Sequence, residues 1–338
     1  MSNKPPIEVP QGAIRLNTDS HKLEFYAQDR WFEMATDTPN LSSRQTNGRG
    51  IFMGGHTPTR QDRIDFITIA TAGGAVNFGS LSDSRSAAAA IASNTRGMLL
   101  GGTSPGNVNT VDFVTITIGG DAQDFGDLTS ARHWTQGCSN QTRGLSAGGN
   151  PGSNVIDFCT IATTGDFLDF GDLTNSTLNQ PQVSANSSNQ SPTRGFFGGG
   201  TPNTTNHIEF VTITTLGNSQ DFGDSTTEVA REARGSSSTR ALIIGGTRAE
   251  PSVSSIIDYF QMATLGNAVD FGNASASFSD GAGCSDCIRV AYALGNNPSN
   301  TDSIDYINIS TGGDAIDFGD LTVARNHLGG CSNGHGGL

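Results

Sequence analysis

The chain has 338 residues, 44 of them glycine, a formal net charge of −13 at pH 7, and only 15% charged residues. So few charged helix formers exclude a coiled coil or a helical bundle. The apolar runs, such as residues 87–92, fall far short of the roughly 18 residues of a membrane-spanning helix. The acidic balance argues against binding to nucleic acid, whose phosphates attract a basic surface. We therefore expect neither a nucleic-acid partner nor membrane insertion.

Residues 1–40 differ in pattern from the rest of the chain. Residues 14–17 and 22–26 predict two short strands around a turn, and residues 37–40 predict a linker. The segment carries Ile14, Arg15, Tyr26 and Trp31 within the pattern G-x-I-R-x-N-T-D, L-E-x-Y and W. This pattern resembles a small β-module found near the start of bacteriophage tail-fibre and other virion proteins. The resemblance implies that residues 1–40 attach the chain to other virion proteins through those four residues.

From residue 41 onward, one unit is repeated six times. Each copy has an apolar-acidic-aromatic strand, followed twelve residues after the acidic position by Asn or Asp and then Phe-Gly. An arginine in a Thr-Arg-Gly-like turn and a short apolar run ending in Gly-Gly, or Gly-Asn in the sixth copy, precede it. The alternating β-branched residues, with no helical apolar stripe, predict four short strands per copy. The acidic positions lie 45 to 52 residues apart, at Asp65, Asp112, Asp157, Glu209, Asp258 and Asp305.

A period of about 50 residues built from four strands is typical of propeller blades. The strand ending in Gly-Gly, the acidic-aromatic pair and the aromatic residue of the fourth strand resemble the kelch repeat, with Phe in place of the usual Trp. Together these features predict an all-β, six-bladed kelch-like β-propeller of four-stranded blades over residues 41–338, preceded by the small N-terminal β-module. Residues 323–333 should pair with residues 47–55, which would close the ring and remove two exposed edges.

The loops after the Gly-Gly doublets differ in length and are rich in Asn, Thr and Ser, whereas the turns between third and fourth strands hardly vary. In a propeller these two kinds of connection emerge on opposite faces. The variable loops therefore predict a ligand-binding face, although ordinary solvated loops would have the same composition. The candidate ligand-face residues are His56, Asn107, Asn109, Asn150, Asn203, Asn206, Arg248 and Asn297.

The sequence predicts no catalytic residue, no cofactor and no metal site. The repeated Asp-Phe-Gly is not a kinase motif, because no lysine follows Lys22 and no His-Arg-Asp occurs. Cys284 and Cys287 have CxxC spacing, but no second pair completes a zinc site. Cys138, Cys284 and Cys331 share one repeat position, which predicts small, buried packing residues.

The arginines of the Thr-Arg-Gly-like turns also recur once per copy. Because the repeated acidic residues recur with the same period, we expect a ring of charge-assisted Arg–carboxylate pairs. The arginines concerned are Arg49, Arg96, Arg143, Arg194, Arg240 and Arg289.

These features predict a non-enzymatic bacteriophage virion protein: a tail fibre, a tail or neck protein, or a capsid decoration. It would be assembled in the host cytoplasm, occur in multiple copies per particle, and display a propeller that binds host surface polysaccharide, a protein receptor or a neighbouring virion protein. Two alternatives stay open. One is a cellular kelch-like protein-interaction scaffold, and the other is a propeller-based glycan-active enzyme, which would need convergent carboxylates.

Overall fold

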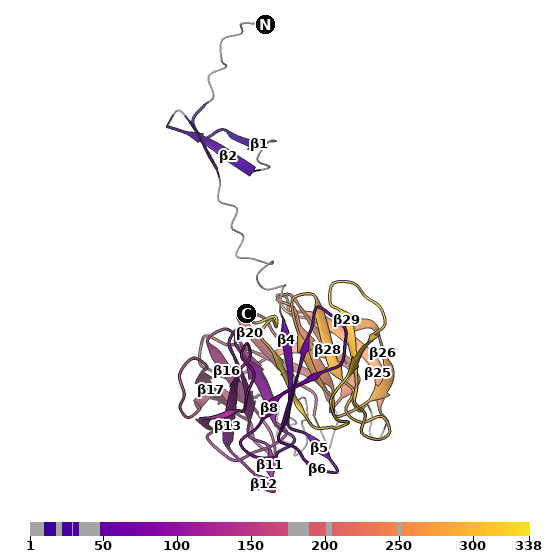
Figure 1. The fold of residues 1–338 in the computed structure, drawn as a ribbon. Helices are drawn as coiled ribbons and strands as arrows, with labels where there is room; N and C mark the ends of the chain where they lie inside the picture. The colour runs from indigo at the N-terminus through magenta and orange to yellow at the C-terminus, as the bar shows by residue number, and fades with distance from the viewer. Residues whose placement is uncertain are drawn as a thin grey trace, which may run out of the picture. The chain divides into compact units, whose positions relative to one another are not determined.

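The computed structural model describes residues 10–17, 22–28, 30–33, 48–174, 189–200, 205–248 and 252–338. The chain divides into two compact units, Met1–Ser43 and Arg44–Leu338. Within the described residues the regular elements are all strands, which confirms the predicted all-β class (Figure 1).

The smaller unit contains one antiparallel meander of three strands, β1 (Ile14–Asn17), β2 (Lys22–Ala27) and β3 (Arg30–Glu33). Side chains alternate between the two faces of such a sheet. Ile14 pairs with Phe25, and Phe25 pairs with Phe32, so these three residues share one face. Arg15 pairs with Glu24 on the opposite face.

The described part of the larger unit contains six four-stranded antiparallel sheets. Each sheet matches one copy of the sequence repeat. In pairing order, the first three sheets are β31 (Gly329–Ser332), β4 (Arg49–Met53), β7 (Arg63–Thr68) and β8 (Val76–Ser80); β9 (Ala89–Ala92), β10 (Arg96–Leu100), β13 (Thr110–Thr115) and β14 (Gln123–Asp127); and β15 (Gln136–Ser139), β16 (Arg143–Ala147), β17 (Val155–Thr160) and β18 (Leu168–Asp172).

The other three sheets follow the same order. They are β19 (Asn189–Gln190), β20 (Arg194–Gly198), β21 (Thr205–Thr212) and β22 (Gln220–Val229); β23 (Ala233–Ser236), β24 (Arg240–Ile244), β25 (Ser254–Gln261) and β26 (Val269–Phe278); and β27 (Ala282–Ser285), β28 (Arg289–Ala293), β29 (Ser303–Asn308) and β30 (Ile316–Asp320). Two short hairpins stand in the loops, β5 (His56–Thr57) with β6 (Thr59–Arg60), and β11 (Thr103–Ser104) with β12 (Gly106–Asn107).

One sheet joins the two ends of the larger unit. Its first strand, β31, comes from the C-terminal end of the chain and pairs with β4, with Gly329 opposite Met53 and Ser332 opposite Gly50. Both strands lie within the ranges that the sequence predicts to pair, 323–333 and 47–55. The pairing gives each strand a partner that an open row of sheets would leave exposed to solvent.

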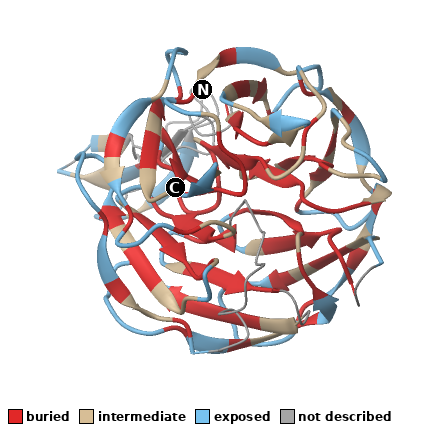
Figure 2. Ribbon diagram, turned by 90° about the horizontal axis from the view of Figure 1, so that it is seen from below, coloured by how far each residue is buried: buried red, intermediate tan, exposed pale blue. Residues whose placement is uncertain are grey.

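The first strands of neighbouring sheets contact one another around a common axis. β9 contacts β15, and the series continues through β19, β23, β27 and β31 back to β9. All six are buried along their whole length, and Figure 2 shows buried segments toward the middle and exposed segments at the rim. The arrangement of sheets is therefore propeller-like. It also explains why most of these strands are rich in Ala, Gly, Ser and Cys, since a Cβ on Gly283 would collide with the backbone of Arg234.

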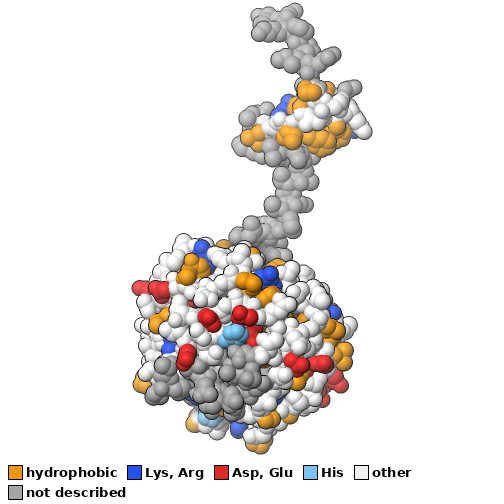
Figure 3. All heavy atoms as spheres, turned by 180° about the vertical axis from the view of Figure 1, so that it is seen from behind, with side chains coloured by type: hydrophobic (Ala, Val, Ile, Leu, Met, Phe, Trp, Pro, Cys, Tyr) orange, Lys and Arg blue, Asp and Glu red, His pale blue; other side chains and the backbone are white. Residues whose placement is uncertain are grey.

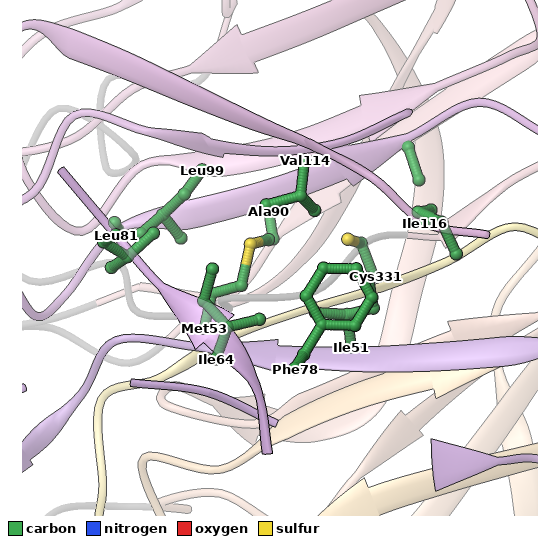
Figure 4. Packing of buried hydrophobic residues seen from close by; sticks show 12 residues of the cluster. Ile51, Met53, Ile64, Phe78, Leu81, Ala90, Leu99, Val114, Ile116 and Cys331 are labelled. Atoms are coloured by element: carbon green, nitrogen blue, oxygen red, sulfur yellow. The ribbon is translucent and has the colours of Figure 1, made fainter. Parts of the chain in front are cut away.

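Hydrophobic clusters fill the junctions between neighbouring sheets. In one of them, Ile51 and Met53 of β4 and Ile64 of β7 pack with Leu99 of β10 and Val114 of β13. Figure 4 shows these side chains pointing toward one another from the two sheets. Among the described residues there are six such clusters, one at each junction. Burial of each large apolar side chain stabilises the fold by about 1.5–3 kcal/mol.

The repeated Phe-Gly is where the backbones of neighbouring sheets meet. Gly171 has φ +150°, and a Cβ at this position would lie 2.5 Å from the carbonyl oxygen of Gly217 in the next sheet. In return, the N–H of Gly217 donates to the carbonyl oxygen of Phe170 at 3.0 Å. The same hydrogen bond recurs at all six junctions, including the one from Gly73 to Phe318 that links the last sheet to the first. Only glycine combines this approach with this backbone conformation.

Candidate functional site

The connections of the larger unit form two groups at opposite ends of the antiparallel strands. One group, the loop face, comprises the loops from the second to the third strand and the links from the fourth strand to the next sheet. The other group, the turn face, comprises the Thr-Arg-Gly-like hairpins and the turns between third and fourth strands. On the side of the molecule shown in Figure 3, charged and hydrophobic side chains stand singly or in small groups among uncharged ones over the described part of the larger unit. Any specific site must therefore be found from local geometry.

Several candidate residues from the sequence are held in place by hydrogen bonds within the loop face. The Nδ2 of the exposed Asn107 donates to the carbonyl oxygen of Asn150 at 3.1 Å, which brings these two together from neighbouring sheets. The N–H of His56 donates to the carbonyl oxygen of Asn326 at 2.8 Å. Main-chain atoms of Asn109, Asn206 and Asn297 form hydrogen bonds within their own repeats, and Asn203 lies outside the described residues.

Arg248, another candidate ligand-face residue, has a mostly buried side chain that lines a surface pocket together with Thr227 and Ser252. Its side chain is 7% exposed, and its Nη1 lies 3.0 Å from Oδ2 of Asp258. Its Nη2 also donates to the carbonyl oxygen of Ile256 at 3.3 Å. The loop position suggested exposure, but the side chain folds inward because a buried carboxylate needs a cationic partner.

The predicted pairing of the turn arginines with the repeated carboxylates is wrong. For three of the buried carboxylates, the arginine partner comes instead from the link that precedes a first strand. Arg85 Nη2 lies 2.8 Å from Asp112, and Arg325 Nη1 lies 2.8 Å from Asp65, with all four side chains at most 1% exposed. Arg132 and Asp157 form the equivalent pair.

The turn arginines connect neighbouring sheets in a different way. Arg143, for example, stacks on Phe158 of its own sheet with 5.0 Å between guanidinium and ring centre. Its Nη1 donates to the carbonyl oxygen of Ile213 in the next sheet at 3.2 Å. The other five repeat both contacts. A carbonyl oxygen and an aromatic ring supply the acceptors that a half-exposed guanidinium requires, so no carboxylate is needed.

The centre of the loop face is formed by five residues with positive φ, which we call the mouth ring. Each lies just before the first strand of its sheet, and φ is between 52° and 60°. They are linked by main-chain hydrogen bonds, from Trp134 to Ala87, from Ala87 to His327, from His327 to Asp280 and from Asp280 to Arg231. The equivalent position of the remaining sheet falls within residues 175–188, outside the described residues. A bulky residue in this conformation is strained, and such strain is concentrated at functional sites.

The side chains at the mouth ring are chemically diverse. Asp280 is 4% exposed, and its Oδ1 lies 3.2 Å from Nδ1 of His327 and 4.0 Å from Nε of Arg231. The ring of Trp134 lies 4.3 Å from that of His133 and 6.4 Å from that of His327, centre to centre. Burial lowers the pKa of His133 and, against the attraction of Asp280, that of His327. Both imidazoles are therefore neutral at pH 7.

Four polar atoms at or beside the mouth ring are buried without a hydrogen-bond partner among the described residues: Trp134 Nε1, His133 Nδ1, Asn326 Oδ1 and His327 Nδ1. Sequence reasoning missed these residues because it relied on what the copies share. The signal that could have identified them is variation at one position of an otherwise repeated unit. The equivalent positions 87, 134, 231, 280 and 327 hold Ala, Trp, Arg, Asp and His.

The axis below the mouth ring is closed at the turn face by the last residues of the chain. Nε2 of His335 lies 2.8 Å from the carbonyl oxygen of Ala92, and Leu338 is 4% exposed. Gly336 and Gly337 are required here, because a Cβ on either would collide with the backbone of a first strand. The remaining axial cavity, lined in part by His335, measures about 10 Å³. Among the described residues, the axis is therefore closed at the turn face and does not form an open channel.

The cysteines take the structural role that the sequence predicts. Cys138, Cys284 and Cys331 are buried in first strands, and burial raises the pKa of each thiol. Cys287 is a free thiol, so the CxxC spacing forms no disulfide. In the described residues no group of three or more His, Cys, Asp or Glu could hold a metal ion. Nor does the described part of the chain contain a helix suited to crossing a membrane.

The four candidate attachment residues divide between the two faces of the N-terminal sheet. Arg15 pairs with Glu24 at 2.8 Å and lies 4.1 Å from the ring centre of Trp31. Trp31 packs against Tyr26 with an edge-on geometry, 5.2 Å between centres. Ile14 lies on the opposite face and is 64% exposed, beside Leu16 at 60%. No protein-family model and no curated protein sequence matches this chain.

Proposed function

We propose that the chain is a non-enzymatic bacteriophage virion protein whose larger unit is a six-bladed kelch-like β-propeller with a ligand-binding loop face. It would serve as a tail fibre, a tail or neck protein, or a capsid decoration, in multiple copies per particle. The observation that carries the binding role is the contrast between the faces. The turn face repeats the same contacts sheet after sheet, whereas the loop face presents different polar and aromatic groups in each copy.

The propeller assignment is supported by three sets of contacts that each return to their starting point. First strands contact one another in a closed series, hydrophobic clusters occupy six junctions among the described residues, and the Phe-Gly hydrogen bond runs from each sheet to the next. Four-stranded sheets repeated about an axis are the defining feature of propellers. Such a scaffold holds variable loops rigidly, which suits recognition.

The attachment role is supported by the separate N-terminal unit. Its sheet of three strands is small, and Ile14, Leu16 and Phe25 on one face are 64%, 60% and 37% exposed. So small a sheet gains stability when its hydrophobic face packs against another element. Contact with another virion protein would supply that cover, with residues 1–40 as the attachment segment.

Two deletions test this division of roles in the phage that encodes the chain. Removal of residues 1–43 leaves β4 between β31 and β7, so the larger unit should fold but be missing from purified particles. Removal of residues 1–56 also deletes β4 and exposes the edges of two strands, and this protein should aggregate. Normal incorporation of the first deletion would contradict the attachment role of the N-terminal unit.

A further inference from the structure

We propose that the mouth ring, with His133 beside it, binds a single neutral sugar ring at the end of a glycan. The inference rests on the proposed function, since it identifies the ligand class of the loop face. No catalytic step is involved, and the closed axis confines the ligand to the mouth.

The first argument is the concentration of unsatisfied hydrogen-bonding groups. Nε1 of Trp134 and Nδ1 of His133 come from adjacent residues and are both buried without a partner among the described residues. The carboxamide oxygen of Asn326, at the position equivalent to His133, is likewise buried without a partner. Leaving such groups unpaired is unfavourable, so native proteins pair them with protein, water or ligand. A sugar offers hydroxyl groups that both donate and accept hydrogen bonds.

The second argument is the balance of charge. Arg231 and Asp280 carry opposite charges 4.0 Å apart, and burial keeps the two imidazoles neutral by lowering the pKa of His133 and of His327. Among the described residues of the mouth ring, the formal charges of Arg231 and Asp280 cancel, so the ring itself has no excess charge that would select a phosphate, a carboxylate or an ammonium group. Its combination of aromatic surface with a few fixed polar groups is typical of a site for an uncharged organic ligand.

The third argument is preorganisation. Trp134 has φ 52° and is fixed by a main-chain hydrogen bond to Ala87, and His327 has the same φ and is held by Asp280. Because the backbone already holds these side chains in a strained conformation, little further ordering is required when a ligand binds. An indole supplies an apolar face together with a polar N–H, which matches the alternating C–H and O–H surface of a pyranose.

Tryptophan fluorescence can report ligand binding at the mouth ring, because the chain contains only two tryptophans, Trp31 and Trp134. In the full-length variant Trp31→Phe, the fluorescence comes from the mouth alone. This variant is titrated with glucose, galactose, mannose and N-acetylglucosamine. At least one of them should give a saturable change in fluorescence with a Kd of about 1 mM, which corresponds to a binding free energy of about −4 kcal/mol. Glucuronic acid and glucose 6-phosphate are the charged counterparts.

Binding is then measured by calorimetry in variants that keep the fold. Trp134→Ala and His327→Gln should each weaken sugar binding at least tenfold, while Trp31→Ala, the matched control, should leave it unchanged. Melting curves identify any variant that fails to fold, and His327→Gln, which keeps a polar side chain of similar length, supplies the result if Trp134→Ala does so. The absence of a saturable signal with all four neutral sugars, or tighter binding of the charged sugars, would overturn the proposal.

A particle experiment separates this proposal from the proposed function. Phage that carry Trp134→Ala should assemble with the normal amount of the chain but adsorb at least tenfold more slowly to host cells. Normal assembly with normal adsorption would refute the sugar site and leave the virion role intact. Absence of the wild-type chain from particles would refute the virion role, whereas sugar binding by the purified protein would still support the site.

Discussion

The buried pair of Arg325 and Asp65 connects residues 260 positions apart and gives the sharpest test of how the larger unit is held together. Both side chains are 0% exposed, and the nitrogen–oxygen distance is 2.8 Å. Arg325→Ala would leave the Asp65 carboxylate buried with only the hydroxyl and N–H of Thr322 as partners. Removing one member of such a pair destabilises a protein by about 3–5 kcal/mol.

Arg49→Ala is the matched control, because Arg49 lies in the same sheet and is half-exposed. It loses two hydrogen bonds to carbonyl oxygens, both 3.1 Å, and a stacking contact with Phe66 at 5.1 Å, which together contribute about 1 kcal/mol. Replacing both members of the buried pair, as Arg325→Met with Asp65→Leu, should recover most of the loss because no unpaired charge remains.

Urea unfolding, followed by circular dichroism and by fluorescence, measures these differences when the two transitions coincide. Arg325→Ala should unfold at a clearly lower midpoint than Arg49→Ala, at an unchanged slope. If the two variants were equally stable, or if the double replacement were no better than Arg325→Ala, the reasoning about the buried charge would be refuted.

Four further results are expected. Arg143→Ala should reduce the free energy of unfolding by only about 1 kcal/mol in urea melts, because its partners are a carbonyl oxygen and a ring; a loss of 3 kcal/mol or more would indicate a buried carboxylate partner. Gly171→Ala should lower the melting temperature by several degrees, since its φ of +150° and the nearby Gly217 exclude a side chain. The control Gly106→Ala, which faces open space, should leave the melting temperature unchanged. Equal effects of the two variants would contradict the close backbone approach assigned to the repeated Phe-Gly. Burial lowers the pKa of His335 to about 4 from an ordinary 6.5, so between these pH values the unfolded chain binds a proton that the folded chain excludes. The free energy of unfolding should therefore fall by up to about 3 kcal/mol as the pH drops from 6.5 to 4. If His335→Gln showed the same decrease of stability with pH as the wild type, this reasoning would be refuted. Deletion of residues 1–43 should leave the melting temperature of the larger unit unchanged in calorimetry, and a large decrease would show that the units are not independent.

The sequence predicted the all-β class and the strand pattern because six copies reinforce each other. The spacing from Asp157 to Phe170, for instance, is repeated closely enough to fix where the third and fourth strands lie. The same reliance on shared features led to the wrong prediction that the arginines of the Thr-Arg-Gly-like turns pair with the repeated carboxylates. Both Arg132 and Arg143 belong to recurrent motifs, and only the three-dimensional path of the chain decides which of them reaches Asp157.

The candidate site was harder to predict for the same reason. Trp134 and His327 occupy equivalent positions but differ in type, so a comparison of copies discards them. The closed axis was also missed, because Gly336 and Gly337 look like a loose tail in the sequence, and their function depends on backbone contacts with strands far away in the chain. The buried pairing of Arg248 with Asp258 was not foreseen, because a position in a loop does not determine whether its side chain turns outward or inward.

The central claim is that the chain is a structural component of a phage particle, and mass spectrometry of gradient-purified particles tests it most directly. The phage that encodes the chain should yield peptides from both Met1–Ser43 and Arg44–Leu338, at several copies per particle relative to the major capsid protein. Recovery of the chain only from the soluble fraction of the lysate, with none in the particles, would contradict the account.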